Sequence, residues 1–224
     1  MVQCYSGMNP VELSIFANRI EAVCDEMGAA LQRAAFSPNI RDRLDYSCAV
    51  FDADGELCAQ AAHIPVHLGS MAFAMRGIVE GIDWKEGDMV ILNDPYMGGT
   101  HLPDVTVIAP VFIDKQVLGF VANRAHHADI GAEQPGSMPL STSLQQEGLV
   151  IQPQKLVEQG VINEARMNRL MQPMRNPAES TGDFSAQIAA NRRGYHRLIE
   201  LVRQMGIQRY LEALEALNNY AEQL

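Results

Sequence analysis

The sequence predicts an α+β protein in which an amphipathic helix precedes antiparallel β-hairpins and the C-terminal part is again helical. Three observations support this prediction. Apolar residues recur at helical spacing near the start, two pairs of β-rich runs follow across polar turns, and helical spacing returns from Lys155. With 224 residues, 47% of them hydrophobic, the chain is long enough to bury a full core, and we expect a single domain over residues 1–224.

The first helix is predicted to begin after Asn9 and to end near Ala35. Asn9 is a good N-cap residue, Pro10 suits the first helical position, and Glu12 stands where a capping box needs an acidic side chain. The apolar face is formed by Leu13, Phe16, Ile20, Val23, Met27 and Leu31.

The first hairpin is predicted from residues 46–51 and 57–61, which flank Asp52-Ala53-Asp54-Gly55. The link into it, residues 39–45, is rich in charge. It is either a solvated connector or a segment in which Arg41 or Arg43 faces an anionic ligand.

A short segment with two histidines follows the first hairpin. His63 and His67 would share a helical face, but Pro65 between them favours a loop or a helix entrance ahead of a helix at about 71–79. Each histidine is either structural or functional. His67 is the better functional candidate because the small residues Gly69 and Ser70 follow it.

The second hairpin is predicted from residues 105–112 and 117–122, with a turn centred between Asp114 and Lys115. That turn places Asp104 opposite Ala125 and Pro103 opposite His126. His101, Asp104 and His126 then come within reach of one point, and a register slip of one residue would present His127 instead.

Two imidazoles and a carboxylate on one side of a divalent ion leave room for water and substrate, as a catalytic metal requires. We therefore predict a metal site at His101, Asp104 and His126. The alternative is that these are ordinary polar residues of a Gly-rich loop and a strand end. The candidate catalytic residues around the site are His67, Asp94, His127 and Glu147.

The loop before His101 has no phosphate-binding motif. Gly98 and Gly99 allow the backbone to approach a ligand closely, but no Lys-Ser/Thr pair follows them, so ATP chemistry is expected elsewhere. Residues 128–139 form a Gly/Pro-rich loop that either borders a pocket or is an ordinary surface loop.

The C-terminal part is predicted to contain helices at 156–171, 178–205 and 207–223. Their apolar spacing is typical of core or of a partner-facing seam. Arg192, Arg193 and His196 are expected on a solvated or subunit-contacting face.

The composition excludes some classes of partner. A formal net charge of −10 argues against nucleic acid and against an anionic membrane surface. The sequence has no long apolar run and no signal-peptide pattern at its start, so we expect a cytoplasmic protein. Cys4, Cys24, Cys48 and Cys58 have no metal-binding spacing and are expected to be thiols in the core, although a nucleophilic cysteine is an alternative.

Three long segments carry a resemblance to a known family. They read NIRDRLDYSCAVFDADGELCAQAAHIPVHLGSM, NDPYMGGTHLPDVTVIAPVF and NRAHHADIGAEQPGSMP, and together they resemble the hydantoinase B family over residues 8–210. Relatives of that family include the second half of 5-oxoprolinase and the alpha subunits of acetone and acetophenone carboxylases. Family subunits continue well beyond these motifs, so the chain resembles an N-terminal portion.

The resemblance implies a hydrolase subunit that acts on a cyclic amide such as a hydantoin or 5-oxoproline. ATP is expected to be used by a hydantoinase A-like partner in a hetero-oligomer. In the carboxylase relatives, manganese is held at positions that match His101, Asp104 and His126, and Zn²⁺ or Fe²⁺ also suit such ligands. A ketone carboxylase and a non-catalytic, metal-stabilised scaffold subunit are the alternatives.

Overall fold

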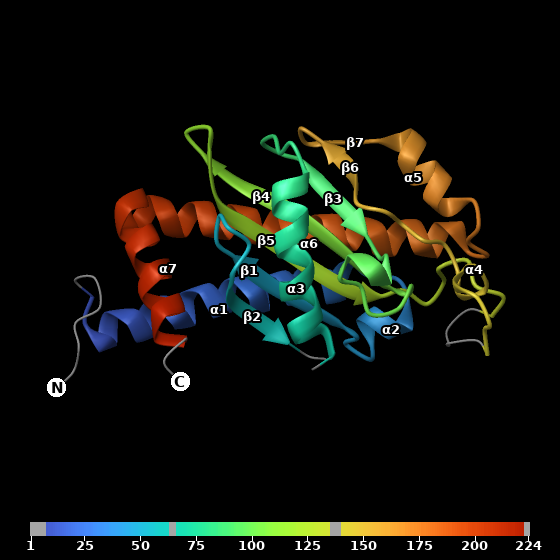
Figure 1. Ribbon diagram of the computed structural model, residues 1–224, viewed down its shortest axis with the longest axis horizontal. Coiled ribbons are helices and arrows are strands. Elements are labelled where there is room, and N and C mark those ends of the chain that lie inside the picture. Colours follow the sequence, from blue (N-terminus) through green and yellow to red (C-terminus); the bar gives the residue numbers. More distant parts are fainter. Residues whose placement is uncertain (1–7, 63–65, 135–139, 222–224) are drawn as a thin grey trace.

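The computed structural model describes residues 8–62, 66–134 and 140–221, and it has the α+β architecture that the sequence predicts. A seven-stranded antiparallel sheet in the order β2-β1-β5-β4-β3-β6-β7 lies between helices on its two faces (Figure 1). The strands are β1 (Tyr46–Phe51), β2 (Leu57–Ala62), β3 (Met89–Leu92), β4 (Asp104–Ile113), β5 (Gln116–His126), β6 (Gln154–Glu158) and β7 (Val161–Ile162). The helices are α1 (Pro10–Ala34), α2 (Pro38–Arg41), α3 (Val66–Gly81), the 3₁₀ turn η1 (Pro95–Met97), α4 (Leu144–Glu147), α5 (Glu164–Met171), α6 (Pro177–Met205) and α7 (Ile207–Ala221).

Helices α1 and α6 cover one face of the sheet, and α3 crosses the other face (Figure 1). Apolar side chains fill both interfaces. The α1–α6 side buries residues such as Phe16, Val107 and Phe184, and the α3 side buries Met75 and Phe120. Successive residues of a strand therefore point into two different cores, one on each face of the sheet.

The N-terminal helix begins as predicted. The Asn9 side chain accepts hydrogen bonds from the backbone N–H groups of Val11 and Glu12, at 3.0 and 2.9 Å. The Glu12 carboxylate accepts one in return from the Asn9 N–H, at 3.0 Å, and this completes a capping box. The helix ends at Ala34, one residue before the predicted end.

The second hairpin has the predicted turn but a different register at its open end. Asp114 and Lys115 form the turn, both with positive φ, as a tight two-residue hairpin requires. A β-bulge then leaves Leu118 without a partner in the ladder between β4 and β5. The extra residue shifts all later pairs by one, so Asp104 lies opposite His126 and not opposite Ala125.

The segment after Lys155 differs from the predicted helix at 156–171. It forms β6, a tight turn and β7 before α5 begins at Glu164. Gln159 and Gly160 both have positive φ, which a helix does not allow. Leu156 and Val157 are buried because β6 pairs with β3, and this long-range pairing outweighs the local helical spacing.

The other predicted elements are close to those observed. The helix after the first hairpin is longer than predicted and begins at Val66, so His67 lies in its first turn, whereas His63 lies outside the described residues. Helices α6 and α7 match the predictions within a few residues. Within the described ranges, no helix is both long and apolar enough to cross a bilayer.

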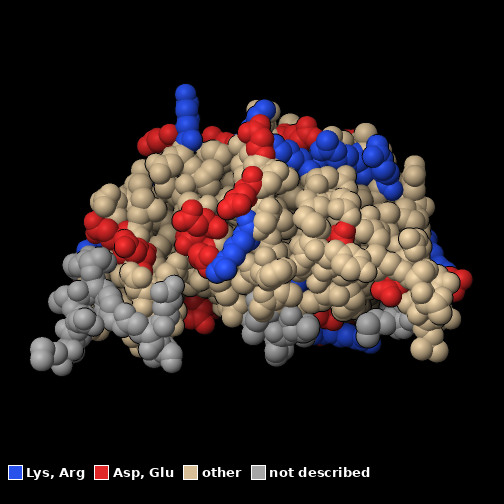
Figure 2. All heavy atoms as spheres, in the orientation of Figure 1, with Lys and Arg blue, Asp and Glu red and all other residues tan. Residues whose placement is uncertain are grey.

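Charged side chains on the face seen in Figure 2 are interspersed with uncharged ones. Lys and Arg gather toward one edge, over the region of β6 and α5, with acidic side chains beside them. This basic edge is narrow, and the whole chain carries a formal net charge of −10. The face in this view therefore has no broad basic surface of the kind that binds a phosphate backbone.

Candidate metal centre

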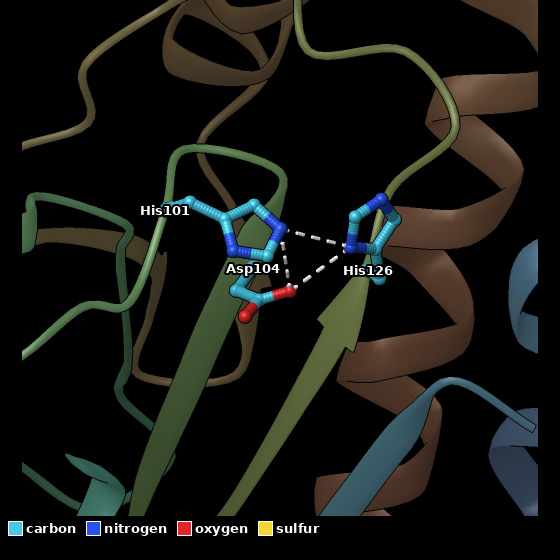
Figure 3. A group of neighbouring side chains, drawn as sticks. All are labelled: His101, Asp104 and His126. Atoms are coloured by element: carbon cyan, nitrogen blue, oxygen red, sulfur yellow. Dashed lines mark hydrogen bonds and ion pairs between the residues drawn. The ribbon is translucent and has the colours of Figure 1, made fainter. Parts of the chain in front are cut away.

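Three side chains converge at the open end of the β4–β5 hairpin. The His126 Nδ1 atom lies 3.2 Å from Asp104 Oδ1 and 3.1 Å from His101 Nε2. The third side of the triangle, from His101 Nε2 to Asp104 Oδ1, measures 3.5 Å. Figure 3 shows the two rings and the carboxylate pointing toward one another from the strand ends and the preceding loop.

This geometry fits a divalent ion. Ligands bound at about 2.1 Å to one ion lie roughly 3 Å apart when they are neighbours in its coordination sphere. The three donor atoms have separations close to this, and all lie within 4.8 Å of one another. Two nitrogens and one oxygen suit Zn²⁺, Mn²⁺ or Fe²⁺.

The hairpin register and a turn position the three residues. Asp104 and His126 are a directly opposed pair, so their side chains leave the same face of the sheet. His101 is brought back by a turn in which the Asp104 N–H donates to the His101 carbonyl at 3.0 Å. A separation of 25 positions between the two histidines is therefore closed by strand pairing.

Asp104 is held as a carboxylate at the base of the site. Its side chain is fully buried, and burial alone raises the pKa of its carboxyl group. Hydrogen bonds from His126, His67 and Thr100 outweigh this effect and hold the pKa of Asp104 well below its ordinary range. Burial lowers the pKa of His101, which favours the neutral imidazole that a metal ligand requires.

His67 is the predicted catalytic candidate that contacts the cluster. Its side chain is 1% exposed and lies between β1 and β4. The Nδ1 atom lies 3.1 Å from Ser47 Oγ, and Nε2 lies 3.4 Å from Asp104 Oδ2. His67 therefore orients the carboxylate oxygen that faces away from the two other histidines.

Asp45 is a fourth polar residue at the cluster that the sequence argument missed. Its Oδ2 atom lies 3.8 Å from His126 Nδ1, and its Oδ1 atom lies 4.0 Å from His67 Nε2. Its backbone carbonyl accepts a hydrogen bond from the His126 N–H at 2.9 Å. The available signal was its position directly before β1, but the pairing of β1 with β5 is not readable from local sequence.

The charged neighbours of Asp45 do not join the site. Arg41 and Arg43 are exposed, and Arg41 pairs with its neighbour Asp42 at 3.0 Å. The exposure of the two arginines fits the solvated-connector alternative, whereas Asn39 and Ile40 of the same link are buried. The ligand-facing alternative stays a prediction.

Three other candidates lie apart from the cluster. His127 faces the α6 side, where its Nε2 atom lies 2.8 Å from Gln187 Oε1 and burial lowers its pKa. Asp94 caps η1 through the Tyr96 N–H at 2.9 Å, and Glu147 accepts a hydrogen bond from Ser141 at 2.9 Å. In the described part of the chain, no hydrogen bond or ion pair joins these three residues to His101, Asp104 or His126.

The remaining sequence candidates are placed as follows. Part of the loop predicted at 128–139 lies outside the described residues. Cys24 and Cys48 are fully buried, and burial raises the pKa of both thiols, which disfavours a nucleophilic role. Arg193 pairs with Glu26 at 2.5 Å on an exposed face, as expected for a solvated residue of α6.

Comparisons with known proteins agree on one family. The family model for hydantoinase B/oxoprolinase matches residues 9–224. The chain is 40% identical over 222 residues to the uncharacterized protein MJ0963 of Methanocaldococcus jannaschii. That alignment covers 96% of this chain and 39% of the relative. It is 42% identical over 223 residues to 5-oxoprolinase 1 of Arabidopsis thaliana, covering 92% of this chain and 18% of that protein.

Two solved structures share the fold. The ATP-dependent caprolactamase from Pseudomonas jessenii superposes with a TM-score of 0.88 at 31% identity, over 97% of this chain and 38% of that one. Acetone carboxylase, at 22% identity, shares the fold with a TM-score of 0.86 over 93% of this chain and 28% of its own. The chain thus spans 39% or less of the length of each of these four relatives. The chain belongs to the hydantoinase B/oxoprolinase family.

Proposed function

We propose that this chain carries the metal centre of an ATP-dependent amidohydrolase that opens a cyclic amide. The cluster of His101, Asp104 and His126 is the observation that carries the proposal, because its donor atoms are spaced as the ligands of one divalent ion. The family and its named members, 5-oxoprolinase and caprolactamase, support the class of substrate. We expect Mn²⁺, with Zn²⁺ and Fe²⁺ as alternatives.

The residues divide into ligands and supports. His101, Asp104 and His126 would hold the ion, and the Asp45 carboxylate at the rim would supply a further oxygen. A divalent ion bound there supplies Lewis acidity that polarises a carbonyl and acidifies water. His67 keeps the buried Asp104 carboxylate oriented through its 3.4 Å contact. Asp94, His127 and Glu147 are proposed to act outside the coordination sphere by positioning loops or substrate.

ATP is proposed to be used by a hydantoinase A-like partner. This chain contains no Gly-rich loop followed by Lys and Ser or Thr, the arrangement that cradles nucleotide phosphates in one large class of ATP-binding proteins. The proposed division of labour assigns phosphorylation of the amide oxygen to the partner. Hydrolysis of the activated amide is then completed at the metal centre, in a cytoplasmic hetero-oligomer.

The test is a product analysis with the purified protein, its hydantoinase A-like partner and ATP. Hydantoins, 5-oxoproline and larger lactams are compared with acetone and acetophenone, each with and without labelled bicarbonate. The expected products are ring-opened amino acids with ADP. Labelled carbon in a keto acid would show a carboxylase instead. Unchanged turnover in a His101→Ala complex would support the scaffold alternative and overturn the proposal.

A further inference from the structure

Arg124 is a fully buried cation below the metal cluster. It lies on β5 two positions before His126, so both side chains leave the same face of the sheet. No carboxylate in the described ranges forms an ion pair with it, and its guanidinium group donates to neutral oxygen acceptors. Burying an arginine without an ion pair is unfavourable in free energy, which indicates that Arg124 has a specific role.

The guanidinium donates to three different segments. Its Nε atom donates to Thr106 Oγ1 at 2.8 Å on β4. One terminal nitrogen donates to Ser70 Oγ at 2.6 Å in α3, and the other donates to the Gly98 carbonyl at 3.0 Å in the loop after η1. A planar guanidinium holds such acceptors at fixed mutual distances and angles.

Each acceptor stands two or three positions from a residue of the cluster or from the supporting His67. Thr106 follows Asp104 by two residues, Ser70 follows His67 by three, and Gly98 precedes His101 by three. The side chain that joins the three acceptors itself precedes His126 by two. One guanidinium therefore links the four segments that carry the cluster and its supporting histidine.

The loop after η1 has no strand pairing, and the bond from Arg124 to the Gly98 carbonyl is one of the hydrogen bonds that hold it, beside Gly99 N–H to the Asp94 carbonyl and Asn93 Nδ2 to the Leu102 carbonyl. Gly98 has φ +90°, and a Cβ atom built there would lie 2.4 Å from the Ala74 Cβ atom, so the loop packs directly on α3. This close approach aims the Gly98 carbonyl at Arg124. His101 follows Gly98 by three residues, so a displacement of the loop would also displace the His101 ring.

We propose that Arg124 is a positioning residue that sets the spacing of the metal ligands and thereby the affinity for the ion. This inference rests on the proposed metal site. A positive charge near a divalent cation is by itself unfavourable for binding. If only charge mattered, removing Arg124 would tighten metal binding, whereas loss of its geometry would weaken it. The sign of the change therefore separates the two roles.

The experiment is a Mn²⁺ titration of the purified protein, followed by the electron paramagnetic resonance signal of free Mn²⁺. Arg124→Met and Arg124→Lys are both expected to bind Mn²⁺ about 10–100-fold more weakly, which is the range for loss of a residue that orients metal ligands. The lysine variant should be about as weak as the methionine variant, because a single ammonium cannot reproduce the three-way link. Affinity that is unchanged or higher in both variants would overturn the proposal.

Two further variants cover the case in which Arg124 variants do not fold. Ser70→Ala and Thr106→Val each remove one acceptor and keep the cation, and each is expected to weaken Mn²⁺ binding severalfold. Unchanged affinity in both would reject the positioning role. Asp88→Asn is the matched control, because it alters a buried charged group before β3, away from the cluster, and should leave Mn²⁺ affinity unchanged.

The outcomes for the two proposals are distinguishable. If the unaltered protein binds neither Mn²⁺ nor Zn²⁺, the metal centre itself is rejected. If it binds the ion and the Arg124, Ser70 and Thr106 variants bind equally well, only the role of Arg124 is rejected.

Discussion

At the scale of single residues, face and register decide which side chains form the cluster. His126 and His127 are neighbours with the same chemistry, yet strand geometry sends them to opposite faces. His126 meets Asp104, while His127 packs against Phe184 with ring centroids 4.4 Å apart. The two residues therefore offer a matched pair for testing the site.

The first prediction compares His126→Ala with His127→Ala. His126→Ala removes a proposed ligand. Metal affinity should fall by more than the roughly 10–100-fold that is typical when a residue that only orients a ligand is lost. His127→Ala should keep the ion bound and instead reduce stability, because it empties a buried volume beside Phe184. Metal content and thermal unfolding of the two proteins check this, and loss of metal in the His127 variant alone would contradict the assignment.

The second prediction concerns Asp45. Asp45→Asn keeps the size of the side chain but removes a negative charge 3.8 Å from His126 Nδ1. Metal affinity and turnover should both fall, because a neutral amide is a weaker donor to a divalent cation than a carboxylate. Asp42→Asn is the control, since that carboxylate is exposed and bonded to Arg41. Equal effects of the two substitutions on metal affinity would remove Asp45 from the site.

At the scale of elements, one bulged residue aligns the whole site. The turn at Asp114-Lys115 alone would pair Asp104 with Ala125, and the extra residue Leu118 moves the pairing to His126. The bulge therefore places the Asp104 carboxylate opposite His126 at the open end of the hairpin. The site depends on the ladder between β4 and β5 as much as on its own residues.

The third prediction tests the buried end of β3. Asp88 accepts hydrogen bonds from the backbone N–H groups of Lys85 and Gln159, both at 2.9 Å, and pairs with Lys155 at 2.7 Å. Burial alone raises the pKa of Asp88, but these donors outweigh it and lower the pKa below its ordinary value of 3.8. Asp88→Asn should reduce the free energy of unfolding at pH 7 by about 1–3 kcal/mol.

The pH dependence of that loss has a defined sign. A carboxyl group with a lowered pKa in the folded state stabilises the protein above its unfolded pKa, and this contribution disappears as the pH falls through the folded value. The difference between the unaltered protein and Asp88→Asn should therefore shrink below about pH 4. Denaturant titrations at several pH values measure it, with exposed Asp54→Asn as the control. A difference that grew on acidification would contradict the lowered pKa.

At the scale of the whole molecule, the two faces of the sheet have different tasks. Helices α1 and α6 cover one face of the sheet and α3 covers the other (Figure 1). The α1–α6 side buries the larger core, while the α3 side carries His67, Arg124 and the cluster at the strand ends. The proposed ligands come from β4, β5 and the loop between β3 and β4, so an ion bound there would join segments that are distant in sequence.

The fourth prediction follows from this cross-linking. An ion that binds only the folded state stabilises it, by about 2.7 kcal/mol when its free concentration is 100 times its dissociation constant. For a chain of this size the midpoint of thermal unfolding should rise by roughly 5–10 °C. Differential scanning calorimetry with Mn²⁺ and with a chelator measures the shift. A His101→Ala protein should show little or no shift, and a full shift in that variant would place the ion elsewhere.

Local sequence determined much of this protein. The capping box at Asn9, the turn at Asp114-Lys115 and the alternation of the strands depend on neighbouring residues, so the α+β class and the gathering of His101, Asp104 and His126 near the open end of one hairpin follow from the sequence alone. The site residues themselves are short-range turn and strand-end positions, which the hairpin brings together.

Tertiary structure alone decided the rest, because it depends on which distant strands pair. Residues 156–162 have helical spacing, but pairing of β6 with β3 makes them strands. Asp45 reaches the cluster only because β1 pairs with β5, and His126 faces Asp104 only because a bulge absorbs Leu118. Arg124 reads as an ordinary strand residue in the sequence. Its role emerges only where β4, α3 and the Gly98 loop meet around one guanidinium, since hydrogen bonds across such distances leave no local pattern.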